Sequence, residues 1–183
     1  IGMMAVDIGA FTVFLYGFRE REKIYDLFEL ATGTRMTTSY TRVGGLSRDI
    51  PEGFIGRVRD FLDQLPHTVE DMVNLLNRNR IWLDRTRDVG AITPDDAVSW
   101  GISGPALRAA GHYRDVRMDE PYSSYEDYDF DVPVGKNGDV FDRYLVRMEE
   151  IRQSRRICYQ IIDNMPDGPV NIEIGRASCR ERV

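Results

Sequence analysis

The residues with the clearest chemical potential lie in the apolar run IGMMAVDIGAFTVFLYGF, which holds one carboxylate, Asp7. An ionised carboxylate taken out of water must find a partner or accept a proton, because desolvating its charge is costly. Phe14 and Phe18 follow Asp7 at i+7 and i+11, which places all three on one side of a helix or its continuation. A buried acid beside two aromatic walls suits proton transfer in an apolar pocket. A structural carboxylate and ordinary core packing are the commoner meaning of such a pattern, so both interpretations stay open.

The elements that must position these residues are predicted to be helices. The apolar run favours a first helix over 3–16, apolar on nearly every face, and a second over 18–31 that ends at Gly33. Residues 36–43 are β-prone, and Gly44-Gly45 is typical of the turn that follows such a strand. The candidate acid and rings are therefore expected on the opening helix and its continuation.

The rest of the chain continues the helical pattern. Pro51 opens a helix that Pro66 is expected to end, and Thr68 is expected to cap the next one. A strand is expected at 127–133, and the longest helix at 139–165. The predicted fold class is mainly α, a helical bundle with one or two minor strands.

Composition and charge narrow the class of protein. The net charge is −6 and no basic stripe interleaved with aromatic residues is present, which argues against nucleic acid as a partner. The apolar start is too interrupted, by Asp7 and by glycines, to predict a membrane span. His67 and His112 have no cysteine or carboxylate partners at ligand spacing, so no metal site is predicted.

The two ends of the chain have unusual sequences. The chain opens without methionine inside a helical pattern, so we expect residues 1–173 to be an internal fragment of one domain. Back-translation of residues 174–183, IGRASCRERV, fits a common sequencing adapter, and we expect this segment to be translated adapter rather than protein. Removing its net charge of +2 leaves −8 and a single cysteine, Cys158. One cysteine gives no disulfide framework, which favours a reducing compartment.

Long stretches of the sequence resemble a known family. From residue 1 to about residue 170 the chain is similar, in order and spacing, to the D subunit of respiratory complex I, the proton-pumping NADH–quinone oxidoreductase. That protein is a relative of the large subunit of nickel–iron hydrogenases. The stretches that carry the resemblance are AVDIGAFTVFLYGFREREKIYDLFELATGTRM, YTRVGGLSRDIPEGF, NRIWLDRTRDVGAITPDDAVSWGISGPALRAAG and DVRMDEPYSSYEDYDFDVPVGKNGDVFDRYLVRMEEIRQSRRI. The resemblance implies a helical core, in agreement with the pattern above.

The resemblance also implies roles for individual residues. Asp7 matches the acid that bonds a histidine of the quinone pocket, where its carboxylate would orient that imidazole and receive charge when the imidazole gives up its proton. Phe14 and Phe18 match aromatic residues near the quinone cavity. The histidine and a headgroup-binding tyrosine belong to the N-terminal part of such a protein, so this chain is expected to hold half of the site.

The family further implies what the chain binds and where it works. Quinone is the expected substrate, while NADH and the iron–sulfur clusters are expected on partner subunits, including the one that carries the terminal cluster. The protein is expected to be peripheral, on the cytoplasmic side of the bacterial cell membrane, with the fragment alone inactive. Two alternatives stay open: the large-subunit homologue of a membrane-bound nickel–iron hydrogenase, and a structural assembly protein without a site of its own.

One departure from the family pattern gives a prediction. Many members carry a histidine after the pair that is Arg35-Met36 here, close to the terminal cluster and coupled to its redox state, whereas this chain has Thr37, which cannot titrate. We therefore expect the potential of that cluster to depend less on pH in the complex containing this chain than in histidine-bearing relatives. A potentiometric titration at several pH values measures the slope, and a slope as steep as in those relatives would contradict the prediction.

Overall fold

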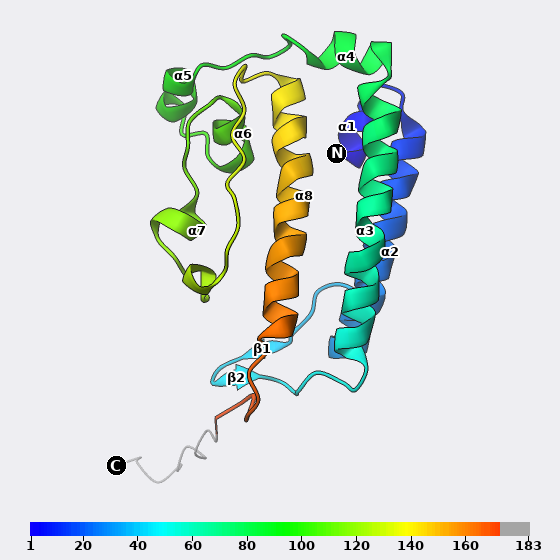
Figure 1. Cartoon of the computed structure of the whole chain (residues 1–183), viewed down its shortest axis with the longest axis vertical. Helices are drawn as coiled ribbons and strands as arrows, with labels where there is room; N and C mark the ends of the chain where they lie inside the picture. Colours follow the sequence, from blue (N-terminus) through cyan, green and yellow to red (C-terminus); the bar gives the residue numbers. More distant parts are fainter. Residues whose placement is uncertain (173–183) are drawn as a thin grey trace, which may run out of the picture.

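A computed structural model describes residues 1–172 of the chain (Figure 1). Its elements are, in chain order, α1 (Gly2–Asp7), α2 (Phe11–Thr32), β1 (Thr41–Arg42), β2 (Gly45–Leu46), α3 (Phe54–Asn77), α4 (Arg80–Thr86), α5 (Pro94–Ser99), α6 (Gly104–Ala109), α7 (Val116–Asp119), the 3₁₀ turn η1 (Tyr125–Asp127) and α8 (Val140–Asp163). The predicted fold class, mainly α with minor strands, is confirmed.

Three long helices form the framework of the fold. In the view of Figure 1, α3 lies between α2 and α8, and both of these helices contact it. The short helix α1 folds back on α2, and α4 bridges the ends of α3 and α8. The helices α5, α6 and α7 lie beyond α8, where α6 packs against it. The main core lies where the framework helices meet α1 and α4, and its buried residues are Ala5, Val13, Val69, Met72, Leu76, Trp82, Tyr144 and Met148.

The opening segment differs from its prediction. A continuous first helix over 3–16 was expected, but α1 ends at Asp7 and α2 begins at Phe11. Gly9 causes the break, because its φ of +91° is a left-handed conformation that glycine adopts without a steric penalty. The amide of Gly9 bonds the carbonyl of Val6 at 2.8 Å, which ends α1 as a capped turn. Among the helices of residues 1–172, none combines the length and the hydropathy that a membrane span requires.

The predicted break at Pro66 is also wrong, since α3 runs through this residue without interruption. A proline inside a helix has no amide hydrogen to donate, so the carbonyl four residues before it loses its usual partner. That carbonyl belongs to Leu62, and the Nε of Arg155 on α8 donates to it at 2.6 Å. A side chain 89 residues beyond Pro66 thus supplies the bond that the proline removes, which helps α3 to continue.

The starts of two later helices are fixed by local capping residues. Thr93 caps α5 by accepting a hydrogen bond from the amide of Asp96, and Asp139 caps α8 by accepting one from the amide of Asp142. The long final helix is therefore confirmed within a residue or two at each end. The strand expected at 127–133 does not form, and the preceding segment instead contains α7 and η1. The β-prone segment around 36–43 gives only the two-residue strand β1, paired antiparallel with β2.

Tyr144 gives a stability prediction from the centre of the core. Its ring meets that of Trp82 edge-on with centroids 5.2 Å apart, and its buried hydroxyl has no hydrogen-bond partner within the described residues. Burial raises the pKa of Tyr144 to about 12, because the ionised phenolate loses its hydration. Removing a buried, unpaired hydroxyl should be neutral or stabilising by up to about 1 kcal/mol, so we expect Tyr144→Phe to raise or preserve the free energy of unfolding.

Urea denaturation followed by circular dichroism measures this change. Tyr159→Phe is the matched control, because the Tyr159 hydroxyl donates to Asp63 and accepts from Arg155. We expect the control to lose about 1 kcal/mol. A larger loss in Tyr144→Phe than in the control would contradict the prediction.

Candidate functional site

Asp7 is the last residue of α1, and its side chain is exposed. The expectation that this carboxylate is buried is wrong for the described structure. Gly9 ends α1 directly after Asp7, so the acid lies at the tip of a short helix rather than inside the bundle. Within residues 1–172 the Asp7 carboxylate makes neither a hydrogen bond nor an ion pair by the usual distance criteria. It is therefore free to accept a donor from outside these residues.

Phe14 and Phe18 lie one turn apart on α2, and the structure brings them together. Their ring centroids are 4.2 Å apart, and both side chains are half-buried. The guanidinium of Arg21 lies 5.3 Å from the centre of the Phe18 ring, in a cation–π arrangement. Gly2 lies against Phe14 so closely that a side chain on Gly2 would meet the Phe14 Cα at 3.2 Å. The two rings thus form an aromatic wall, which the break at Gly9 separates from the helix carrying Asp7.

The buried carboxylate of this region is Glu20, which the sequence prediction missed. Glu20 on α2 is only 6% exposed. It follows the buried Val13 by seven residues, about two helical turns, so it shares the inward face of α2. That spacing was the signal in the sequence, and the surrounding charged run REREK concealed it.

The hydrogen-bond partners of Glu20 indicate a structural role for its carboxylate. Burial opposes ionisation of Glu20, but hydrogen bonds from Lys23 and Arg19 outweigh it and lower the pKa of the carboxyl below its ordinary value. Glu20 therefore stays ionised at neutral pH and is a poor proton donor. Arg19 also reaches Thr68 on α3 at 3.4 Å, so the cluster joins α2 to α3.

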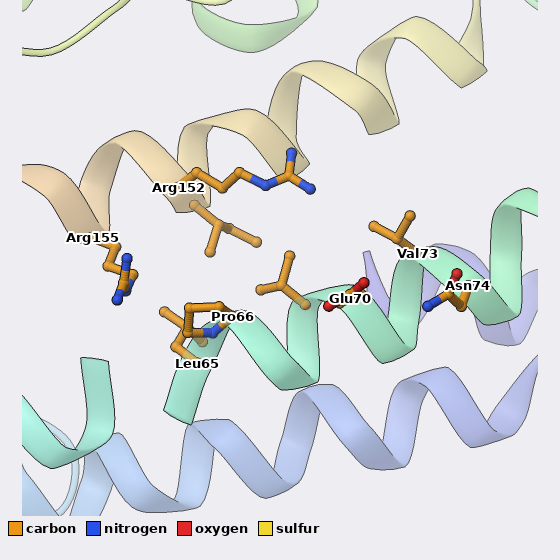
Figure 2. A pocket seen from close by; sticks show the side chains of 9 residues that line it. Leu65, Pro66, Glu70, Val73, Asn74, Arg152 and Arg155 are labelled. Carbon is orange, nitrogen blue, oxygen red and sulfur yellow. The ribbon is translucent and has the colours of Figure 1, made fainter. Parts of the chain in front are cut away.

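One hollow is lined in part by this cluster, and a second lies between α3 and α8. The first, of about 330 Å³, is lined by Phe18, Glu20 and Arg21 of α2, by Met72 of α3 and by the first residues of the chain. The second is a cleft of about 430 Å³ between α3 and α8, shown in Figure 2. Asp7 does not line the hollow beside Phe18, so its carboxylate is not the acid of that cavity.

Thr37 lies in the loop that follows α2, and it is exposed. Its φ of +36° is unusual for a β-branched residue and places local strain there. The loop doubles back along α2, because Arg35 forms ion pairs with Asp26 at 2.6 Å and with Glu29 at 3.3 Å.

The folded-back loop does not bring Thr37 near Asp7. Met36 reaches the hydroxyl of Tyr25, with 3.9 Å between sulfur and oxygen. The part of α2 from Phe11 to Tyr25 lies between Met36 and α1, and at 1.5 Å per residue it is about 20 Å long. Asp7 and Thr37 are therefore too far apart to contact one small ring-shaped ligand.

No cluster of three or more metal-ligating side chains occurs in the described part of the chain. His67 and His112 are both exposed there. The thiol of Cys158 is half-buried, and burial raises its pKa. These residues add no second chemical centre to the candidate site.

Comparison with known proteins gives consistent matches. Residues 7–182 match the family described as the 49 kDa subunit of respiratory-chain NADH dehydrogenase. The chain is 54% identical over 170 residues to the D subunit of NADH-quinone oxidoreductase from Geotalea uraniireducens, an alignment that covers 93% of this chain and 44% of the relative. It is 50% identical to the corresponding D subunit of Akkermansia muciniphila and 49% identical to that of a Wolbachia from Brugia malayi, in alignments covering 100% of this chain and 44% and 47% of those relatives.

The chain thus spans less than half the length of these curated relatives. The expected adapter segment, 174–183, lies outside the described residues, and the family match includes most of it without distinguishing it from the rest. With a family match over nearly the whole sequence and identities of about one half, the chain belongs to the family of the 49 kDa subunit of respiratory-chain NADH dehydrogenase.

Proposed function

We propose that this chain is part of the D subunit of a proton-pumping NADH–quinone oxidoreductase, and that it helps to form the chamber where quinone is reduced beside the terminal iron–sulfur cluster. The relatives of this chain, which are D subunits of NADH-quinone oxidoreductases, support this proposal. Quinone is the substrate, and partner subunits hold NADH and the clusters. The protein works peripherally on the cytoplasmic side of the cell membrane. The family match is to the NADH dehydrogenase subunit, which favours quinone reduction over the hydrogenase alternative.

The observation that carries the site proposal is the surface around Asp7. The carboxylate is exposed and has no partner within residues 1–172, and the residues close to it in the sequence include exposed apolar side chains. Met3 precedes Asp7 by one turn of α1 and is 62% exposed. Phe11 and Leu15 at the start of α2 are 56% and 51% exposed. An acid among uncovered apolar side chains is typical of a surface that another element or an apolar ligand completes.

In the mechanism, Asp7 accepts a hydrogen bond from an imidazole supplied by the remainder of the full-length protein. The carboxylate fixes the tautomer of that imidazole and stabilises its cationic form, so that the imidazole can deliver a proton to the reduced quinone. Phe14 and Phe18 contribute an apolar wall that excludes water from the ring. Glu20 stays ionised and holds α2 against α3, which fixes the position of the wall.

Replacement of Asp7 by Asn in the full-length protein tests this role. We expect quinone reductase activity of the assembled complex to fall on the order of 10- to 100-fold, because an amide cannot stabilise the imidazolium. Electron transfer from NADH to a hydrophilic artificial acceptor, which does not need the quinone chamber, should be unchanged.

Two further variants complete the test. Asp7→Glu keeps the charge and should retain most activity, while Asp84→Asn removes an exposed helical carboxylate on α4 and serves as the matched control. Full quinone reductase activity in an assembled Asp7→Asn complex would refute the role and favour a purely structural protein.

A further inference from the structure

The chain reverses its direction between α1 and α2 (Figure 1). The helix α1 folds back along the first turns of α2, where Gly2 reaches the backbone of Phe14. A Cβ on Gly2 would lie 3.2 Å from the Phe14 Cα, so the two helices are in close contact at this point. Ala5, in the middle of α1, is fully buried in the main core. Asp7, the last residue of α1, therefore lies at the tip of an α1–α2 hairpin.

Gly9 forms the turn of this hairpin. Its amide donates to the Val6 carbonyl at 2.8 Å, and the amide of Ala10 donates to the Ala5 carbonyl at 2.7 Å. These two bonds define a Schellman motif, in which a residue just after the helix end adopts a left-handed conformation. Gly9 is that residue, with a φ of +91°. An L side chain is strained at such a φ, which is why glycine is the usual residue at this position of the motif.

The conformation of Gly9, and not the space around it, requires glycine. No heavy atom lies within 4 Å of the position that a Cβ on Gly9 would take. An alanine would therefore fit, but it would either hold the left-handed φ under strain or adopt a right-handed one. The right-handed conformation continues α1 into α2 as one helix, and it would place Asp7 about 6 Å beyond Phe11 along the helix axis.

We propose that Gly9 is a positioning residue for Asp7, and that its left-handed turn sets the place from which the Asp7 carboxylate meets its imidazole partner. The proposal rests on the proposed function, because the place of Asp7 matters to the reaction only if Asp7 acts in quinone reduction. Gly9 itself touches no reactant. Since Phe14 and Phe18 lie on the other side of the turn, the same turn sets the placement of the acid relative to the aromatic wall.

Kinetics of the assembled complex with Gly9→Ala in the full-length protein test the proposal. We expect kcat for quinone reduction to fall about 10-fold or more, because a misplacement on the order of 1 Å can cost about 100-fold in rate. KM for quinone should change less than about twofold, since the aromatic wall on α2 stays in place. Gly9→Asn should retain most of the kcat, because asparagine adopts the left-handed conformation more readily than alanine. Electron transfer from NADH to a hydrophilic artificial acceptor should be unchanged.

Gly53→Ala is the matched control. Gly53 precedes α3 with a φ of +77°, and no heavy atom lies within 4 Å of its Cβ position. This variant carries a similar conformational cost outside the hairpin, so its kcat should equal that of the unmodified complex. Equal losses of kcat in Gly9→Ala and Gly53→Ala would overturn the proposal, and so would full activity in Gly9→Ala.

A double-mutant cycle shows whether Gly9 acts through Asp7. Adding Gly9→Ala to Asp7→Asn should lower kcat no further, and a further loss of about 10-fold would make the two effects independent and overturn the proposal. A loss of kcat in Asp7→Asn with full activity in Gly9→Ala would refute the positioning and leave the proposed function intact. Full activity in Asp7→Asn would refute the proposed function, and the positioning with it.

Gly2→Ala keeps the test decisive if Gly9→Ala prevents assembly. Its Cβ contact with Phe14 requires a shift of only a few tenths of an ångström between α1 and α2. The variant should therefore assemble, and kcat should fall several-fold while KM for quinone stays the same. If Gly9→Ala does not assemble, full kcat in Gly2→Ala would overturn the proposal.

Discussion

Replacement of Arg108 by methionine is expected to lower the free energy of unfolding by about 3–5 kcal/mol, because it leaves the Glu150 carboxylate without a cation and Asp115 with Arg117 alone. Arg108 on α6 is 5% exposed. Its guanidinium pairs with Glu150 on α8 and lies 3.4 Å from Asp115, and it also donates to the Arg114 carbonyl at 3.0 Å. The cluster therefore joins α6, α8 and the segment that leads into α7. Methionine fills much of the same space, so the loss measures charge rather than volume.

Urea denaturation at neutral pH measures the loss, with Arg80→Met as the matched control. Arg80 pairs with Asp84 at i,i+4, but its side chain is 92% exposed, so the control should lose less than about 1 kcal/mol. Equal losses in the two variants would show that the buried cluster contributes no more than a surface pair.

The pH dependence of stability gives an independent check on the same cluster. Burial opposes the ionisation of Asp115, but hydrogen bonds from Arg117 and the charge of Arg108 outweigh it and lower the pKa of the carboxyl. A lowered pKa in the folded state stabilises the fold above the ordinary value of the carboxyl, and this contribution is lost as the pH falls through the lowered value. Arg117 remains in the variant, so only the part of the Arg108→Met deficit that comes from the Asp115–Arg108 pair should shrink below about pH 4, where the unfolded carboxyl takes up its proton.

Local signals in the sequence predicted the elements whose stabilising contacts are local. Thr93 and Asp139 lie just before their helices and accept the first-turn amides, so the starts of α5 and α8 follow from neighbouring residues. The break at Gly9 was missed because a glycine in an apolar run fits a helix interior as well as a helix end. Only the folding of α1 back on α2 decides between these two conformations.

The candidate site was predicted less completely, because the burial of its residues depends on elements that are distant in the sequence. Phe14 and Phe18 lie on one uninterrupted helix, so their spacing was sufficient to bring them together. The buried acid is Glu20 rather than Asp7, because burial depends on which face α3 covers, and α3 is distant in the sequence. Pro66 shows the same dependence, since the bond from Arg155 that compensates for it comes from α8. Residues whose partners are far along the chain thus account for most of the differences.

Replacement of Gly138 by alanine is expected to lower the free energy of unfolding by about 3 kcal/mol, although it adds a single methyl group. The φ of Gly138 is +66°, a left-handed conformation that costs alanine about 1–2 kcal/mol. A Cβ at this position would also overlap the backbone carbonyl of Ile92 and meet the Cα of Ala110 at 3.3 Å. Gly138 cannot move away easily, because its amide donates to Ala109 and its carbonyl accepts from Ile92, both at 3.1 Å. The added Cβ therefore overlaps backbone that two hydrogen bonds hold in place. This overlap should lower the free energy of unfolding by about 1–3 kcal/mol beyond the conformational cost.

Gly53→Ala separates the two causes of this loss. Gly53 has a similar φ of +77°, but no heavy atom lies within 4 Å of the position that its Cβ would take. The control should therefore lose only the conformational part, about 1–2 kcal/mol. Chemical denaturation of both variants gives the difference between them, which isolates the overlap with Ile92. If the two variants unfold at the same urea concentration, the segment before α8 adjusts its backbone, and the close packing of this segment against the residues before α5 is not a source of stability.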